Sequence, residues 1–150
     1  MEATGVTHIG ICVRDMDKSL AFYRDALGMK VLGDRATDPS EGGRPHNYKH
    51  RRSTRRWVSL SYGEGTSPTL TLTSHPDDEP DGQSILLDQV GITHFSFAVS
   101  DVRVLAEELA VKGVELGGPI EAFTNERGEI RSIYVRDPDG ILVQFNAPAG

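Results

Sequence analysis

The segment Thr7–Asp15 reads THIGICVRD, and a related segment, Thr93–Asp101, reads THFSFAVSD. Aligned without a gap, the two segments share Thr, His, Val and Asp at equivalent positions. In both, large apolar residues alternate with small or polar ones, and this period of two predicts a β-strand with one apolar and one open face. The repetition indicates a duplicated structural unit, in which each copy places its histidine, His8 or His94, on the open face.

An amphipathic helix is predicted after each of these strands. Asp15 and Asp101 end the strands and can begin the helices, and Asp17 is a further N-cap candidate in the first helix. Gly28 and Gly113 are suited to end the two helices. Apolar residues recur at helical spacing within these limits, namely Leu20, Tyr23 and Leu27 in the first helix and Val102, Leu105, Ala106 and Leu109 in the second.

Further strands are predicted in each half, at residues 29–34, 56–63 and 68–74 in the first and at 114–117, 129–137 and 141–146 in the second. Each half therefore has the order strand, helix, strand, strand, strand. The helix covers one face of such a sheet and leaves the other open, so two halves can curl around a shared hollow. We expect an α+β fold of two tandem βαβββ modules that form curled mixed sheets around a shared cavity.

The length of 150 residues suits a single domain, residues 1–150. We place module one at residues 5–74, with a long insertion at 35–55, and module two at 91–147. The intervening segment 75–90 is rich in Pro, Asp and Gly and is interpreted as the linker.

Charge and composition argue against several classes of function. The net charge of −6, from 22 acidic and 16 basic residues, disfavours nucleic acid as a partner. No run of about 18 apolar residues suggests a membrane span, and the start of the chain lacks the basic and apolar regions of a secretory signal. Cys12 is the only cysteine, so no intrachain disulfide can form. We expect a cytoplasmic protein with no membrane partner.

One segment, His46–Trp57, is strongly basic although the chain as a whole is acidic, and we call it the basic segment. Its basic residues are Lys49, Arg51, Arg52, Arg55 and Arg56. We interpret it as a solvated basic loop, with a clamp for a ligand's carboxylate or phosphate and nucleic-acid binding as the two alternatives.

The open faces of the predicted strands are mostly small and polar, which suits a ligand cavity better than a core. Two histidines at equivalent places indicate a divalent metal such as Fe, Mn, Ni or Zn, and hydrogen bonding within the sheet is the other interpretation. Since no Asp or Glu lies on these faces, Gln144 is the candidate third ligand and Tyr134 the candidate group for proton transfer. The candidate substrate-binding residues are Trp57, Ser59, Thr71, Ser96, Ser132 and Asn146.

At this point the sequence resembles the vicinal oxygen chelate superfamily, which groups glyoxalases, bleomycin-resistance proteins and extradiol dioxygenases. The resemblance rests on VTHIGICVRDMDKSLAFYRDALGMKVLG in the first half, and on GITHFSFAVSDVRVLAEELAVKGVELGGP and YVRDPDGILVQF in the second. It implies paired βαβββ modules around a cavity, often in a homodimer, with metal ligands on the first and last strands of the modules.

His8 and His94 match the two first-strand ligand positions that the resemblance implies. The last-strand positions carry Thr71 and Gln144, where a glyoxalase-like member would place further ligands. The extradiol dioxygenases are closer, because they use two first-strand histidines and one final-strand Glu, here Gln144. Their Tyr-x-x-acid-Pro-x-Gly pattern corresponds to residues 134–140.

Three functions are therefore compatible with the sequence. The first is a metal-dependent enzyme, extradiol-dioxygenase-like or lyase- or isomerase-like, that acts on a small molecule with vicinal oxygens. The second is a metal-free protein of the bleomycin-resistance type that sequesters an aromatic natural product against Trp57 and Tyr134. The third is a metal-free enzyme with Tyr134 or a histidine as base. We favour the first, because two histidines at matched sites are easier to explain with a metal than without one.

Overall fold

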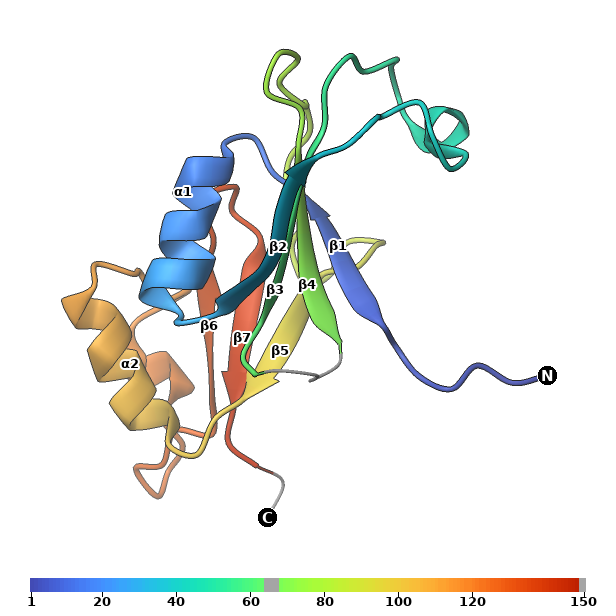
Figure 1. Ribbon diagram of the computed structural model, residues 1–150. Coiled ribbons are helices and arrows are strands. Elements are labelled where there is room, and N and C mark those ends of the chain that lie inside the picture. The colour runs from blue at the N-terminus through green and yellow to red at the C-terminus, as the bar shows by residue number, and fades with distance from the viewer. Residues whose placement is uncertain (64–67, 149–150) are drawn as a thin grey trace. The chain divides into compact units, whose positions relative to one another are not determined.

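The computed structural model describes residues 1–63 and 68–148 (Figure 1). The chain divides into two compact units, Met1–Gly82 and Gln83–Gly150, and each is described by itself. The division falls inside the segment 75–90 that we interpret as the linker. Within the described residues, no helix is long and apolar enough to cross a membrane.

The first unit contains a mixed four-stranded sheet in the order β1-β4-β3-β2. Strand β1 runs parallel to β4, while β3 is antiparallel to both of its neighbours, β4 and β2. Strand β2 extends two residues into the segment expected as the insertion. The strands are β1 (His8–Cys12), β2 (Lys30–Ala36), β3 (Arg56–Ser61) and β4 (Thr69–Ser74).

The helix of the first unit follows β1 and begins at Asp15 as predicted, but the further cap candidate Asp17 is not used and the second half of the helix is a π-helix. Helix α1 covers Met16–Leu20 and continues as a π-helix, η1, over Ala21–Ala26. The N-cap is Asp15, whose carboxylate accepts hydrogen bonds from the backbone N–H groups of residues 17 and 18. Asp17 is therefore not the cap, because the chain is already helical at that position.

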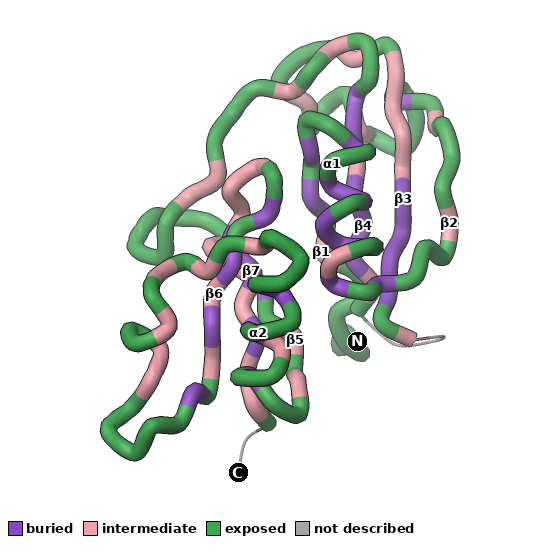
Figure 2. Tube along the Cα trace, turned by 90° about the vertical axis from the view of Figure 1, so that its left-hand side faces the viewer, coloured by how far each residue is buried: buried purple, intermediate pink, exposed green. Residues whose placement is uncertain are grey.

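Helix α1 and η1 cover one face of the sheet, and this face forms the core of the unit (Figure 2). Alternate residues of the two central strands are fully or almost fully buried there, as the period of two predicts. Gly33, on the other face, lies against the Trp57 ring, and a Cβ at this position would meet it at 2.9 Å. The buried core residues include Tyr23, Val58, Leu60, Leu70 and Leu72.

The second unit contains a mixed three-stranded sheet in the order β5-β7-β6, with β5 parallel to β7 and β6 antiparallel to it. Helix α2 begins at its N-cap Asp101 as predicted, and Val102, Ala106 and Leu109 are buried. The elements are β5 (His94–Ala98), α2 (Val102–Val111), β6 (Ser132–Arg136) and β7 (Leu142–Asn146), with 3-10 turns at η3 (Ile120–Phe123) here and η2 (Arg44–Asn47) in the first unit.

One predicted strand of the second module, residues 114–117, is not a strand among the described residues. Only an isolated bridge between Leu116 and Val135 forms there, joined by a hydrogen bond from the Gly117 N–H to the Tyr134 carbonyl. Gly117, Gly118 and Pro119 follow at once, and this sequence is unsuited to continuing a ladder. The α+β fold of two modules with mixed sheets is confirmed, although the second sheet has three strands in this part of the chain.

Candidate functional site

Each unit leaves one face of its sheet free of helix, and the predicted site residues lie on these two open faces. In the first unit, Gly10, Thr71 and Ser59 stand in register across β1, β4 and β3. The next row toward the carboxyl end of β1 contains Cys12, Thr73, Trp57 and Arg35. We call this surface the first open face, defined by His8, Arg35, Trp57, Ser59, Thr71 and Thr73.

His8 begins β1 and is exposed. Its Nδ1 lies 2.9 Å from Oγ1 of Thr7, the residue before it. Because that contact occupies Nδ1, the Nε2 atom is left to meet a ligand. Ser59 and Thr71 are buried, with exposed fractions of 6% and 8%, so the structure brings together small hydroxyl groups at the centre of this face.

The second open face is defined by His94, Ser96, Ser132, Tyr134, Gln144 and Asn146, which come from all three strands of the second unit. Gln144 lies in register between Ser96 and Tyr134. Nδ2 of Asn146 lies 2.8 Å from Oγ of Ser96 and 3.3 Å from Oε1 of Gln144. Asn146 therefore fixes the Gln144 amide and leaves its oxygen with a further lone pair for another partner.

His94 repeats the arrangement found at His8. Its Nδ1 lies 2.8 Å from Oγ1 of Thr93, again the residue before it. The imidazole also meets the Tyr134 ring edge to face, with the ring centroids 5.5 Å apart. The structure thus brings His94, Tyr134 and Gln144 together in one unit and places His8 on the equivalent strand of the other.

The metal-binding capacity of these residues is incomplete within either unit. Among residues 1–63 and 68–148, no three His, Cys, Asp or Glu side chains are grouped so that they could hold a metal ion. The first open face supplies one imidazole and hydroxyl groups, while the second supplies one imidazole, the Gln144 amide oxygen and the Tyr134 phenol. Each unit by itself therefore offers one imidazole and neutral oxygen donors, which is only part of the ligand set of a divalent ion.

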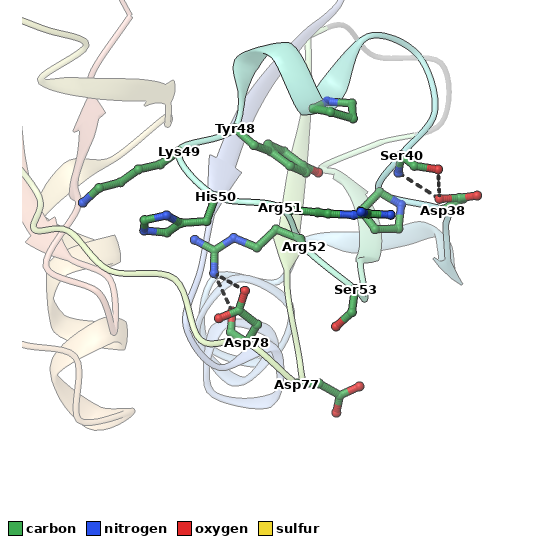
Figure 3. A pocket seen from close by; sticks show the side chains of 12 residues that line it. Asp38, Ser40, Tyr48, Lys49, His50, Arg51, Arg52, Ser53, Asp77 and Asp78 are labelled. Carbon is green, nitrogen blue, oxygen red and sulfur yellow. Dashed lines mark hydrogen bonds and ion pairs between the residues drawn. The ribbon is translucent and has the colours of Figure 1, made fainter.

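The basic segment is not a uniformly solvated loop, because its side chains have different partners. Lys49 pairs with Asp81, and Arg52 pairs with Asp78 at 2.8 Å. Arg52 and Asp78 line a pocket of about 940 Å³ whose walls come mainly from residues 38–53 (Figure 3). Both cationic and anionic side chains line this pocket, so its lining does not favour a ligand of one charge.

Comparison with known proteins relates this architecture to a family. The profile of the Glyoxalase/Bleomycin resistance protein/Dioxygenase superfamily matches residues 5–145. The chain belongs to this superfamily. The lactoylglutathione lyase of Neisseria meningitidis serogroup A is 30% identical over 142 residues, which cover 92% of this chain and 86% of that enzyme.

Solved structures of other superfamily members have the same fold. The trypanothione-dependent glyoxalase I of Leishmania major is 27% identical, with a TM-score of 0.68 over 97% of this chain and 87% of that one. A glyoxalase-family protein of Bacillus cereus superposes over 100% of this chain and 97% of its own, with a TM-score of 0.75 at 18% identity. The latter likeness shows the fold alone.

Sequence reasoning missed the groups that support the candidate ligands. The hydroxyls of Thr7 and Thr93 could have been found, because a threonine precedes the histidine in both repeats. The hydrogen bonds of Asn146 and the stacking of Arg35 on Trp57 depend on strand register, and no sequence pattern marks them.

Proposed function

We propose that this superfamily member is an enzyme that uses a divalent metal, Fe, Mn, Ni or Zn, and acts on a small molecule with vicinal oxygens. His8 and His94 are its imidazole ligands and Gln144 is a third, weaker ligand. The observation that carries this proposal is the pair of matched contacts from threonine Oγ1 to histidine Nδ1, at 2.9 and 2.8 Å.

These contacts have a direct consequence for metal binding. If Nδ1 carries the proton and donates it to the threonine oxygen, Nε2 keeps its lone pair and can accept a metal ion. Partners of this kind on the far nitrogen fix the tautomer and the orientation of metal-ligating histidines. This chain forms the contact at both equivalent positions, as a pair of matched ligands would.

The surrounding residues have separate proposed roles. A bound divalent ion would act as a Lewis acid toward the substrate oxygens. Tyr134, whose ring is in edge contact with that of His94, is our candidate for the group that holds or moves a proton. The residues proposed to contact the substrate are Trp57, Ser59 and Thr71 on the first open face and Ser96, Ser132 and Asn146 on the second.

The name of the Neisseria relative favours a lyase- or isomerase-like reaction over ring cleavage by a dioxygenase. Gln144 supports the same choice, because an amide oxygen is neutral and lowers the charge of the ion less than a carboxylate would. We therefore place α-oxo compounds ahead of catechols as candidate substrates.

Elemental analysis tests this proposal on untagged protein purified without chelator. We compare the wild type with a His8→Ala/His94→Ala variant and with a His46→Ala/His50→Ala control, which removes two exposed histidines of the basic segment. The proposal expects nearly one ion per chain in the wild type and the control, and none in the His8/His94 variant. Equal metal content in all three samples, or none in any, would contradict it.

A metal-free protein that sequesters an aromatic natural product is the second candidate. Thr71 and Gln144 favour it, because they leave both last-strand positions without a carboxylate. Turnover of a substrate that is lost with His8 and His94 would count against this candidate. Tight binding of an aromatic compound, without turnover or metal, would support it.

A further inference from the structure

The cations of the basic segment are divided between the two faces of the first sheet. Arg56 reaches toward the helix face, where its guanidinium binds Asp34 through two hydrogen bonds of 3.0 and 2.8 Å and approaches Asp17 at 3.6 Å. Lys49 and Arg52 also have carboxylate partners. Among the described residues, Arg51 and Arg55 are the two cations of the segment that form no ion pair.

Arg55 is half-buried and is surrounded by neutral acceptors and other cations. Nη1 donates to the Thr37 hydroxyl at 2.6 Å, and Nη2 donates to the Thr73 hydroxyl at 3.5 Å. Within residues 1–63 and 68–148, no carboxylate forms an ion pair with it. Burial first, and then the nearby charges of Arg44 and Arg35, lower the pKa of Arg55 from its usual value.

A second cation is held on the same face by an aromatic ring. The guanidinium of Arg35 lies over the Trp57 ring, 4.5 Å from its centroid. Gly33 lets the ring lie flat against β2, because a Cβ there would approach the indole to 2.9 Å. Arg35 also has no carboxylate partner among the described residues.

Arg35 belongs to the first open face, because Arg35, Trp57 and Thr73 occupy one row across β2, β3 and β4. Arg55 reaches the same row through its contact with the Thr73 hydroxyl. Cys12 continues that row on β1, four residues after His8. At about 3.3 Å per residue, the row lies roughly 13 Å along the strand from the candidate metal ligand. A group bound there would be remote from the reacting oxygens of a substrate.

We infer that Arg35 and Arg55 form an anion subsite beside Trp57, which binds a carboxylate or phosphate at the far end of an extended substrate. Two neighbouring guanidiniums without an acid repel each other, and an oxyanion between them relieves the repulsion through charge-assisted hydrogen bonds. This inference deepens the proposed function, since it gives the substrate of the same open face a distal negative charge.

Binding of simple anions to protein stripped of metal by chelation tests the subsite. The probes are benzoate and phenyl phosphate, with benzamide as the neutral control, and calorimetry measures their affinity. Trp57 is the only tryptophan, so its emission reports binding at this place directly. We expect both anions to change the tryptophan emission and benzamide to have no effect. The anion that binds more tightly shows whether the subsite prefers a carboxylate or a phosphate.

Single charge-removing variants locate the binding. Arg55→Gln and Arg35→Gln are each expected to lower the affinity for the more tightly bound anion by about tenfold, the usual effect of losing one charge-assisted hydrogen bond. Arg51→Gln removes an equal charge from an exposed position of the same segment and is expected to change the affinity less than about twofold. If Arg55→Gln fails to fold, as judged by circular dichroism, Arg35→Gln alone decides the result.

The outcomes separate this inference from the proposed function. Anion binding that depends on Arg35 and Arg55 supports the subsite even if elemental analysis finds no metal. Equal affinity in the wild type, Arg35→Gln and Arg55→Gln proteins would overturn the subsite and leave the metal proposal standing. Binding of benzamide as tight as that of benzoate would also overturn it.

Discussion

The two open faces begin with the same Thr-His pair but differ in what surrounds it. On the second, His94 lies beside Tyr134, and Asn146 holds the Gln144 amide in place. On the first, the residues of β4 nearest His8 are threonines. Arg35 and Arg55 lie farther away, beside Trp57 and Thr73.

We propose that this difference reflects a division of roles between two copies of one unit. The features that the copies share, a histidine and the threonine before it, are those that we propose for the metal ligands and their supporting contacts. The features that differ are suited to separate tasks. The second face offers groups for proton transfer and weak ligation, whereas the first offers cations for recognition of a distant charge.

The largest expected effect is a loss of stability on the helix-covered face of a sheet, compared with its open face. Phe145 is 1% exposed on the helix side of the second sheet. Phe145→Ala should reduce the free energy of unfolding by about 3–5 kcal/mol, through lost burial and a cavity. Tyr134→Phe, on the open side of the same sheet, should change it by less than ~1 kcal/mol. Urea denaturation measures both, and equal losses would contradict the assignment of the two faces.

Adding a carboxylate at Gln144 should raise metal affinity and make this last-strand position differ more from Thr71, which carries only a hydroxyl group. Gln144→Glu places a charged ligand where Asn146 already orients an amide oxygen. We expect it to raise affinity for a divalent ion by about 10- to 100-fold, because carboxylates are stronger ligands than amides. Competition with a chromogenic chelator measures the change. Gln144→Met, which is similar in size but cannot ligate through oxygen, should lower the affinity, and an increase in both variants would refute the role of Gln144.

The threonines should have equal and smaller effects. Thr7→Val and Thr93→Val remove the hydroxyl contacts to His8 and His94 while nearly preserving side-chain shape. Each should weaken metal binding by about tenfold, as loss of a partner on the far nitrogen of a ligand does. Thr69→Val, on β4 beside His8, is the matched control. An effect of Thr93→Val without one of Thr7→Val would break the equivalence of the two halves.

The smallest expected effect is a dependence of stability on pH in the first unit. The hydrogen bonds from Arg56 hold the pKa of Asp34 below its usual value. A carboxylate whose pKa is lower in the folded state stabilises the fold above its unfolded pKa and loses this contribution as the pH falls through its folded pKa. Because both side chains are partly exposed, the contribution should be below ~1 kcal/mol. Urea midpoints at neutral and acid pH should show a smaller acid loss for Asp34→Asn than for wild type, and an equal loss would contradict this assignment.

The fold was largely predictable, because alternation and capping act locally. Asp15 and Asp101 cap their helices through contacts with residues two or three positions away. The segment 114–117 was wrongly predicted as a strand, since its apolar pattern does not reveal that pairing stops at the single bridge of Leu116, before Gly117 and Gly118. Propensity cannot decide such an edge, where pairing depends on the partner strand.

The candidate site was predictable only in part. Placing His8 and His94 on open faces needs no more than a period of two. The role of the basic segment could not be predicted without knowing where Asp34, Asp78 and Asp81 lie. These residues are distant from it in sequence and pair with three of its five cations. The period of two can assign Arg55 and Arg56 to opposite faces of the sheet, but only the long-range contacts show that, among the described residues, Arg56 has a carboxylate partner and Arg55 has none.

The most direct test of the metal proposal is the metal affinity of the single variants His8→Ala and His94→Ala, measured by titrating chelator-stripped protein. If both histidines are ligands, the wild type should bind about one ion per chain and each single variant should bind at least ~100-fold more weakly, since a lost ligand exceeds the effect of a lost supporting contact. Wild-type affinity in either variant, or no binding by the wild-type protein, would contradict the proposal.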